Sequence, residues 1–247
     1  GLCWPQWVLE EARCLFEGTQ KGLLGLEKFK ETQPSFERIS IHPKEGQNPR
    51  ELFEALSSMA LDGLVLSGSE KSVTQVQKDP WVKDYIDGLS SFLSDWKKLS
   101  KPFPVLGICF AHQAISHALG GEVKPSGALK IGPVDVQAIE NSLLPKNFTP
   151  SALKNWNNFV AFHEDQVMTP PSNMLPIMKS AYCPYQSFVH PTLPLWTVQF
   201  HPEMNESILE VSSDKSLWSH CSSKDFKNQK GNDLLEFFAK WILENKT

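Results

Sequence analysis

Apolar positions along the chain recur with two different periods, and each period marks a kind of element. Over residues 80–99 they recur every three to four positions, which predicts a helix with one face turned to a core. Asp79 suits the N-cap, and Pro80 suits the first helical position. The apolar stripe consists of Trp81, Val82, Tyr85, Ile86, Leu89, Phe92, Leu93, Trp96 and Leu99.

Three further helices are expected. Residues 5–16 place their apolar side chains on one helical face, and residues 234–242 form a closing amphipathic helix. A helix that follows Cys109 is expected to end at Gly120 and Gly121, where glycine adopts a left-handed cap at little cost.

Short apolar runs bounded by turn residues predict strands between these helices. The alternation predicts an α/β fold with three layers, in which a mostly parallel twisted sheet has helices on both faces. We expect a single domain over residues 1–247, with insertions or loops near 141–157 and 204–231, where the pattern is irregular. The predicted strands are 36–41, 61–66, 134–139, 159–162 and 195–200.

The segment from Val105 to Gln113 reads as a buried strand that breaks onto a helix, with Cys109 at the break. Gly107 and Ala111 are small enough for the close backbone approach that such an elbow needs. The positive end of the following helix favours the thiolate form, so Cys109 is a candidate nucleophile.

A second apolar strand ends in His201, with Pro202 and Glu203 directly after it. A histidine beside a thiol can act as its base, and a carboxylate can hold the imidazole in the required tautomer. Gly68, Cys109 and His201 each follow a predicted strand. Ligands of parallel sheets bind at the carboxyl ends of strands, so we expect the three residues at one edge.

Backbone amides at this edge can stabilise an oxyanion. The N–H of Phe110 is the first candidate donor, and the N–H groups around Gly68 and Ser69 supply a second. His163 and Asp165 fit a structural hydrogen-bond network as well as a chemical role.

The remaining cysteines, and the histidines as a metal site, have simpler structural explanations. Most cysteines in proteins serve packing, and we assign packing to all but Cys109. The three histidines at 112, 163 and 201 lack the spacing of a zinc site, so the sequence predicts no metal, and it indicates no cofactor. The packing cysteines are Cys3, Cys14, Cys183 and Cys221.

Composition narrows the class of function. The chain has 247 residues, 40% of them hydrophobic, and a net charge of -4, so it can bury a core but offers no basic field for nucleic acid. No apolar run reaches the roughly 20 residues that span a bilayer, which argues against a membrane protein. Five cysteines favour a reducing compartment, hence the cytoplasm, although the start at Gly1 leaves a removed leader open.

Two strings together point to a family. GICFAHQ at 107–113 and QFHPE at 199–203 closely resemble the GxCxGxQ and HPE signatures of class I glutamine amidotransferases. With LVLSGS upstream and AFHEDQV between them, the resemblance covers roughly residues 36–210 and implies the flavodoxin-like class I glutaminase fold. The chain is most similar to the stand-alone branch that resembles the glutaminase domain of GMP synthetase and includes plant γ-glutamyl peptidases.

The resemblance implies a reaction and a set of contacts. Cys109 would attack the side-chain amide of glutamine, release ammonia and form a γ-glutamyl thioester, which is hydrolysed with help from His201 and Glu203. Gln113 and the backbone around Glu164 and Asp165 would contact the glutamyl end of the substrate, glutamine or another small γ-glutamyl compound. No synthetase domain follows in this chain, so use of the ammonia would need a separate synthetase or acceptor subunit.

Two alternatives stay open. The chain resembles free-standing γ-glutamyl peptidases, which implies possible action on γ-glutamyl peptides or glutathione conjugates. It also departs from the family at Ala111, where glycine is usual, and at Ser69, which turns SGG into SGS. These departures motivate a catalytically silent fold that serves as a binding or regulatory module. Retention of Cys109, His201 and Glu203 argues against silence.

Overall fold

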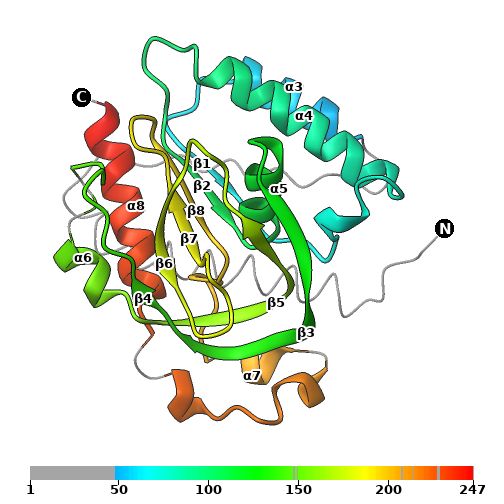
Figure 1. Cartoon of the computed structure of the whole chain (residues 1–247), viewed down its shortest axis with the longest axis vertical. Helices are drawn as coiled ribbons and strands as arrows, with labels where there is room; N and C mark the ends of the chain where they lie inside the picture. The colour runs from blue at the N-terminus through cyan, green and yellow to red at the C-terminus, as the bar shows by residue number, and fades with distance from the viewer. Residues whose placement is uncertain are drawn as a thin grey trace.

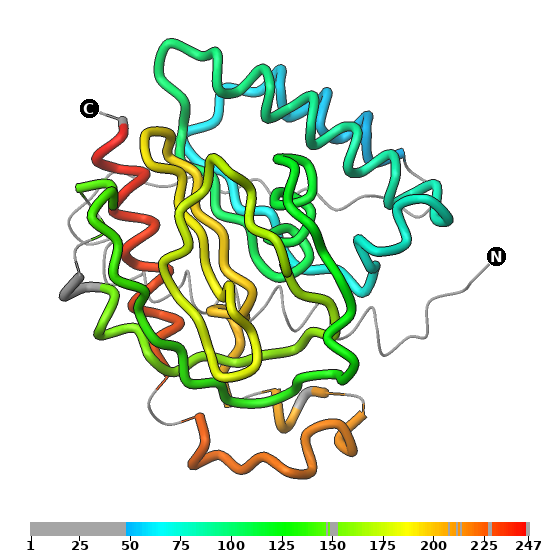
Figure 2. Tube along the Cα trace, in the orientation of Figure 1, coloured from blue at the N-terminus to red at the C-terminus, as the bar shows by residue number. Residues whose placement is uncertain are grey.

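A computed structural model describes residues 48–246 except 147, 149, 207, 213, 227 and 228 (Figures 1 and 2). These residues form a six-stranded sheet, a two-stranded sheet and helices that cover the larger sheet on both faces. The helix predicted at 5–16, the strand predicted at 36–41 and the cysteines Cys3 and Cys14 lie outside the described residues. A single domain over 1–247 therefore stays a prediction.

The six-stranded sheet is half parallel and half antiparallel. β1 (Leu64–Leu66), β2 (Val105–Ile108) and β8 (Leu195–Val198) run parallel to one another. The other three strands pair antiparallel along the order β8-β7-β6-β4. They are β7 (Ser187–Val189), β6 (Leu175–Lys179) and β4 (Gln137–Ala138).

The predicted three-layer α/β architecture is confirmed, with a mixed sheet in place of a mostly parallel one. The connections at 180–186 and 190–194 explain the difference. A parallel pair needs a crossover of a dozen or more residues, so these short links impose antiparallel pairing on β6, β7 and β8.

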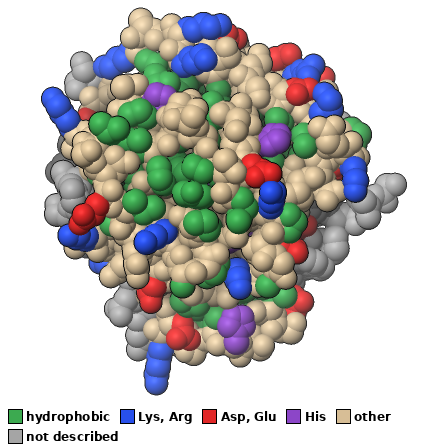
Figure 3. All heavy atoms as spheres, viewed as in Figure 1, with side chains coloured by type: hydrophobic (Ala, Val, Ile, Leu, Met, Phe, Trp, Pro, Cys, Tyr) green, Lys and Arg blue, Asp and Glu red, His purple; other side chains and the backbone are tan. Residues whose placement is uncertain are grey.

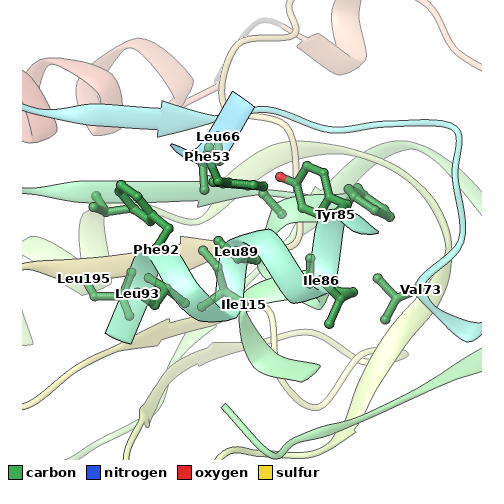
Figure 4. Packing of buried hydrophobic residues seen from close by; sticks show 14 of the residues in the cluster. Phe53, Leu66, Val73, Tyr85, Ile86, Leu89, Phe92, Leu93, Ile115 and Leu195 are labelled. Atoms are coloured by element: carbon green, nitrogen blue, oxygen red, sulfur yellow. The ribbon is translucent and has the colours of Figure 1, made fainter. Parts of the chain in front are cut away.

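Three helices cover one face of this sheet. α4 (Pro80–Trp96) and α5 (Phe110–Ala118) pack on it, and α3 (Pro49–Ser58) packs on α4. The predicted cap of α4 is confirmed, because the side chain of Asp79 accepts a hydrogen bond from the Trp81 amide. Figure 4 shows the resulting core, in which Phe53, Leu89 and Ile115 interlock with the strands.

The opposite face is covered by α8 (Gly231–Lys246) and α6 (Pro150–Asn155). Side chains alternate along β2, so Val105 faces α4 whereas Leu106 and Ile108 face α8. The amphipathic helix predicted at residues 234–242 is confirmed, and it belongs to α8. Segment 141–157 is more regular than predicted, since it contains α6 and buries three apolar side chains. They are Phe148, Leu153 and Trp156.

The two-stranded sheet consists of β3 (Glu122–Asp135) and β5 (Asn158–Thr169), paired antiparallel with bulges. The predicted strand at 159–162 belongs to β5, and the one at 134–139 divides into the end of β3 and β4. Segment 204–231 contains α7 (Ile208–Val211) and two short 3-10 helices, η2 (Lys215–Trp218) and η3 (Ser223–Phe226). It packs Met204, Ile208, Trp218 and Phe226 against Val160 of β5.

The surface carries charges of both signs. On the face drawn in Figure 3, lysine, arginine and carboxylate side chains are scattered, mostly around the rim, and form no field of one sign. Within the described ranges, no helix has both the length and the apolar character that a membrane crossing requires.

Candidate active site

Cys109 lies in a sharp bend between β2 and α5. Its φ of 52° and ψ of -104° make it the one non-glycine residue with a positive φ in the described part of the chain. Its amide donates to the carbonyl of Val198 at 2.8 Å, and its carbonyl accepts from the amide of Gln113 at 3.1 Å. Strand and helix thus hold a strained residue in place, a condition typical of functional sites.

Gly107 permits this bend by its lack of a side chain. A Cβ there would lie 2.6 Å from Cδ1 of Ile115 and 3.3 Å from the backbone of Ala111. Ala111 itself is fully buried within α5. Neither Ala111 nor Ser69 has a positive φ, so neither departure from the family signature falls on a backbone conformation that favours glycine.

His201 and Glu203 form a buried pair just after β8. Nδ1 of His201 lies 2.7 Å from Oε1 of Glu203, and the two residues are each 2% exposed. The amide of His201 donates to the carbonyl of Val160 at 2.7 Å, which fixes the histidine against β5.

The charge state of His201 follows from its neighbours. Burial lowers the pKa of the imidazole, but the negative charges of Glu203 and of the Cys109 thiolate outweigh burial and raise this pKa well above 6.5. The thiol is close enough to His201 for its charge to act on the ring, while Nε2 of His201 has no hydrogen-bond partner among the described residues. The arrangement therefore favours the imidazolium form of His201.

Gly68 lies against both of these residues. A Cβ at this position would be 3.1 Å from Cε1 of His201 and 3.5 Å from Cβ of Cys109. The expected meeting of three strand ends at one edge is confirmed, because β1, β2 and β8 are adjacent and parallel. Phe110 carries the first N–H of α5, a group without an intrahelical partner, and the side chain of Ser69 is exposed.

Two residues that the sequence did not single out contact the thiol. Sγ of Cys109 lies 3.7 Å from the carbonyl oxygen of Phe162 and 3.8 Å from Nε2 of Gln199. Gln199 is fully buried. The sequence did contain one sign of this role, because Gln199 is a polar residue between two apolar ones, Val198 and Phe200, in a buried strand segment.

Gln113 and Asp165 belong to an internal network. Nε2 of Gln113 donates to the carbonyl of Asp165 at 2.8 Å and to Oε1 of Gln199 at 3.2 Å. The same Asp165 carbonyl lies 3.0 Å from Nδ1 of His163, and the Asp165 carboxylate accepts from the hydroxyl of Ser72, just before η1 (Val73–Gln75). The side chain of Glu164 is exposed.

The two other buried histidines are held neutral. Burial lowers the pKa of His112 to about 3, and its ring stacks on Phe188 while Nδ1 lies 2.9 Å from Oγ1 of Thr197. Burial also lowers the pKa of His163 to about 4, despite the opposing hydrogen bond to Asp165. Among the described residues, no cluster of three or more His, Cys, Asp or Glu suits a metal ion.

Cys109, Cys183 and Cys221 are the free thiols of the described part. Cys183 is fully buried, and burial raises its pKa to about 12, which makes it a poor nucleophile. Burial and the charge of Asp225 raise the pKa of Cys221 as well.

Comparisons with known proteins agree with this geometry. The family described as "Glutamine amidotransferase class-I" matches residues 37–210. One subunit of the glutamine-hydrolysing GMP synthase of Sulfolobus acidocaldarius is 29% identical over 161 residues, which cover 65% of this chain and 77% of that protein. The GMP synthase of Pseudoalteromonas atlantica is 26% identical over 171 residues, which cover 64% of this chain but 30% of that protein.

A solved structure supports the fold. The crystal structure of a glutamine amidotransferase from Thermotoga maritima superposes with a TM-score of 0.57 and 18% identity, over 90% of each chain. The superposition covers most of that chain, whereas the matched region spans about a third of the length of the GMP synthases of Pseudoalteromonas atlantica and Aliivibrio fischeri.

Proposed function

Because the chain belongs to the class I glutamine amidotransferase family, we propose that it hydrolyses γ-glutamyl amides, with glutamine as substrate, through a thioester on Cys109. The observation that carries the proposal is the buried arrangement of Cys109, His201 and Glu203 after the adjacent parallel strands β2 and β8. Each of the three has a role that its position supports.

In the first half-reaction, the thiolate of Cys109 attacks the amide carbon of the substrate side chain. The negative charge moves to the carbonyl oxygen, where the N–H groups of Phe110 and Gly68 act as donors. His201 gives its proton to the leaving nitrogen, so that ammonia departs as the C–N bond breaks. A γ-glutamyl thioester remains on Cys109.

In the second half-reaction, neutral His201 takes a proton from water, and the resulting hydroxide attacks the thioester carbon. The C–S bond breaks, glutamate leaves, and the thiolate and imidazolium are restored. The short contact between Nδ1 of His201 and Glu203 keeps Nε2 directed at the thiol throughout. The balance is glutamine plus water to glutamate plus ammonia.

Gln113 supports binding of the glutamyl end indirectly, through the backbone of Asp165. The Gln113 amide fixes the backbone of Asp165, and this backbone, together with that of Glu164, contacts the substrate. We further propose that the ammonia passes to a separate synthetase or acceptor subunit in the cytoplasm. The Sulfolobus acidocaldarius relative, which is itself one subunit of a GMP synthase, supports a separate partner.

Covalent labelling tests this proposal directly. A diazo-ketone analogue of glutamine should attach to Cys109 of the wild-type protein, and peptide mass spectrometry should locate one adduct there. Cys109→Ala should take up no label, while Cys183→Ala, which removes a buried thiol, should label as the wild type does. Ammonia release from glutamine should fall at least about a thousandfold in Cys109→Ala.

Two outcomes would contradict the proposal. Absence of the adduct in well-folded wild-type protein would favour the catalytically silent fold. Full ammonia release by Cys109→Ala would remove the thioester from the reaction. Thermal unfolding of each variant serves as the check that the protein is folded.

A further inference from the structure

A buried glutamine lies beside the thiol without a role in the proposed reaction. Gln199 is fully buried, and its backbone amide donates to the carbonyl of Gln186 at 2.8 Å. Nε2 of its side chain lies 3.8 Å from Sγ of Cys109, within hydrogen-bonding distance of a sulfur atom. Burial of an amide costs free energy unless its polar atoms are paired, so packing alone would favour an apolar side chain here.

The orientation of the Gln199 amide follows from its neighbours. Nε2 of Gln113 donates to the backbone carbonyl of Asp165 at 2.8 Å and to Oε1 of Gln199 at 3.2 Å. A carbonyl oxygen only accepts hydrogen bonds, so the group of Gln113 that faces Asp165 is its NH2 group. The oxygen of Gln199 must then face Gln113, and the NH2 group of Gln199 faces the sulfur.

The sulfur lies between an acceptor and a donor. The carbonyl oxygen of Phe162 lies 3.7 Å from Sγ of Cys109 and can accept a hydrogen bond from the S–H of the neutral thiol. The same oxygen repels a thiolate, because both atoms carry negative charge. The NH2 group of Gln199 has the opposite preference, since a charged sulfur accepts its hydrogen bond more strongly than a neutral one does. The two contacts therefore act on opposite protonation states of the nucleophile.

Gln199 and His201 differ in what they can do for the sulfur. Nε2 of His201 has no hydrogen-bond partner among the described residues, although the charges of its ring and of the Cys109 thiolate interact. His201 also loses and regains its proton during the proposed reaction. The amide of Gln199 keeps its hydrogens throughout, because it does not titrate. It can therefore hold the sulfur before attack and stabilise it again when the C–S bond breaks.

We propose that Gln199 is a further catalytic residue, whose side-chain amide donates to Sγ of Cys109 and stabilises the negative charge of this sulfur as it attacks and as it leaves. This inference rests on the proposed cysteine hydrolase function and adds a residue to its site. The bond from Gln113 holds the Gln199 amide in the required orientation.

Alkylation by iodoacetamide tests this role apart from glutamine binding, since the reagent has no glutamyl part. A thiolate attacks its CH2 carbon, an S–C bond forms and iodide leaves. Gln199→Met keeps the length of the side chain but removes the donor. Alkylation of Cys109 should then be about tenfold slower at about pH 7, because one hydrogen bond to a charged group is lost. The difference should narrow towards about pH 9.5, where a thiol ionises without such help.

Two further measurements accompany the alkylation rates. Peptide mass spectrometry follows the adduct at Cys109 separately from those at other cysteines. In steady-state kinetics with glutamine, kcat of Gln199→Met should fall about tenfold, whereas KM should change less, because the amide contacts the sulfur and not the glutamyl end.

Gln186→Met is the matched control. Gln186 is also a fully buried glutamine, but its Nε2 donates to Oγ of Ser180 at 3.0 Å rather than to the thiol. The control should unfold at a lower temperature than the wild type, as Gln199→Met does, because each loses a buried hydrogen bond. It should nevertheless keep the wild-type rate of alkylation at Cys109.

A second variant serves if Gln199→Met does not fold. Gln199→Asn keeps an amide but shortens the side chain by one methylene, which withdraws the donor from the sulfur. It should slow alkylation at about pH 7 in the same way as Gln199→Met. Thermal unfolding shows which variants are folded.

The outcomes separate this inference from the proposed function. Wild-type rates of alkylation at every pH in a folded Gln199 variant would overturn the inference, with the hydrolase intact. A loss of the same size at every pH, or an equal loss in Gln186→Met, would assign Gln199 to packing and overturn it as well. Failure of the wild type to hydrolyse glutamine and to take up the diazo-ketone label would refute the proposed function, and the catalytic role of Gln199 with it.

Discussion

The two sheets contribute to the site in different ways. The parallel half of the larger sheet is covered on both faces, and every residue of β2 and β8 is buried. It places Cys109 and His201 at the ends of adjacent strands. The β3–β5 sheet is exposed along much of β3 and contains bulges, and its register places Lys130 opposite His163.

Under the proposed function, this difference separates the chemistry from the substrate contacts. Cys109 and His201, which would hold the bond-forming geometry, follow tightly packed strands, where a displacement disturbs the core. The backbone of Glu164 and Asp165, which would contact the glutamyl end, belongs to the smaller sheet, where sequence can change at smaller cost to stability. Variants in each region should therefore fail in different ways.

The largest effect is expected from Glu203→Gln, in the rigid region. The amide keeps the shape but removes the charge that orients His201, and activity should fall about ten-thousandfold, as for orienting carboxylates elsewhere. The rate of labelling at Cys109 and the rate of ammonia release, both measured against pH, check this expectation. An activity within twofold of the wild type would contradict it.

The pH dependence of the same pair has a defined sign. The folded protein raises the pKa of His201, so above pH 6.5 it holds a proton that the unfolded chain gives up. The stabilisation from this proton is fully present below about pH 6.5 and is lost as pH rises through the folded pKa. In Glu203→Gln that loss should move to lower pH, which urea unfolding at several pH values can measure.

Gln113→Ala tests the link between the two regions. It removes the donor to the buried Asp165 carbonyl, so the free energy of unfolding should fall by about 1–3 kcal/mol. The KM for glutamine should rise more than kcat falls, because the glutamyl end loses its support. Urea unfolding and steady-state kinetics measure the two effects. A change in kcat alone would place Gln113 in the chemistry instead.

Packing in the two regions can be compared through two substitutions, Gly107→Ala and Leu129→Ala, and their effects on the free energy of unfolding. The methyl group at 107 would press on Ile115 and on the backbone of Ala111, and should lower the free energy of unfolding by about 1–3 kcal/mol. Leu129, 49% exposed between the paired segments of β3, should lose less than about 0.5 kcal/mol. Equal losses in urea unfolding would remove the distinction.

The smallest effect on activity is expected from Ala111→Gly, which restores the usual family residue. Glycine inside α5 costs about 1 kcal/mol of helix stability. Activity should change less than about threefold, since the helical backbone of Ala111 does not require glycine. A gain of a hundredfold in glutamine hydrolysis would show that the methyl group had held the elbow in an inactive position.

Sequence patterns within a few residues were enough to predict the elements whose formation depends on neighbouring residues. The cap at Asp79 and the stripe of α4 could be read directly, and so could the elbow at Cys109 and the buried strand before His201. The antiparallel half of the sheet could not, because its short strands depend on pairing with distant segments. The role of Gln199 and the opposition of Lys130 to His163 also arise from long-range register, which a single sequence does not display.

The hydrogen bond from the amide of His201 to the carbonyl of Val160 has a consequence for how this protein can evolve. It attaches His201 to the strand that also carries Phe162 and His163. A transplanted pair of strands β3 and β5 would therefore bring its own placement of His201, as well as new side chains beside it. Exchange of substrate preference between relatives should proceed by single side-chain changes on a retained backbone rather than by replacement of both strands.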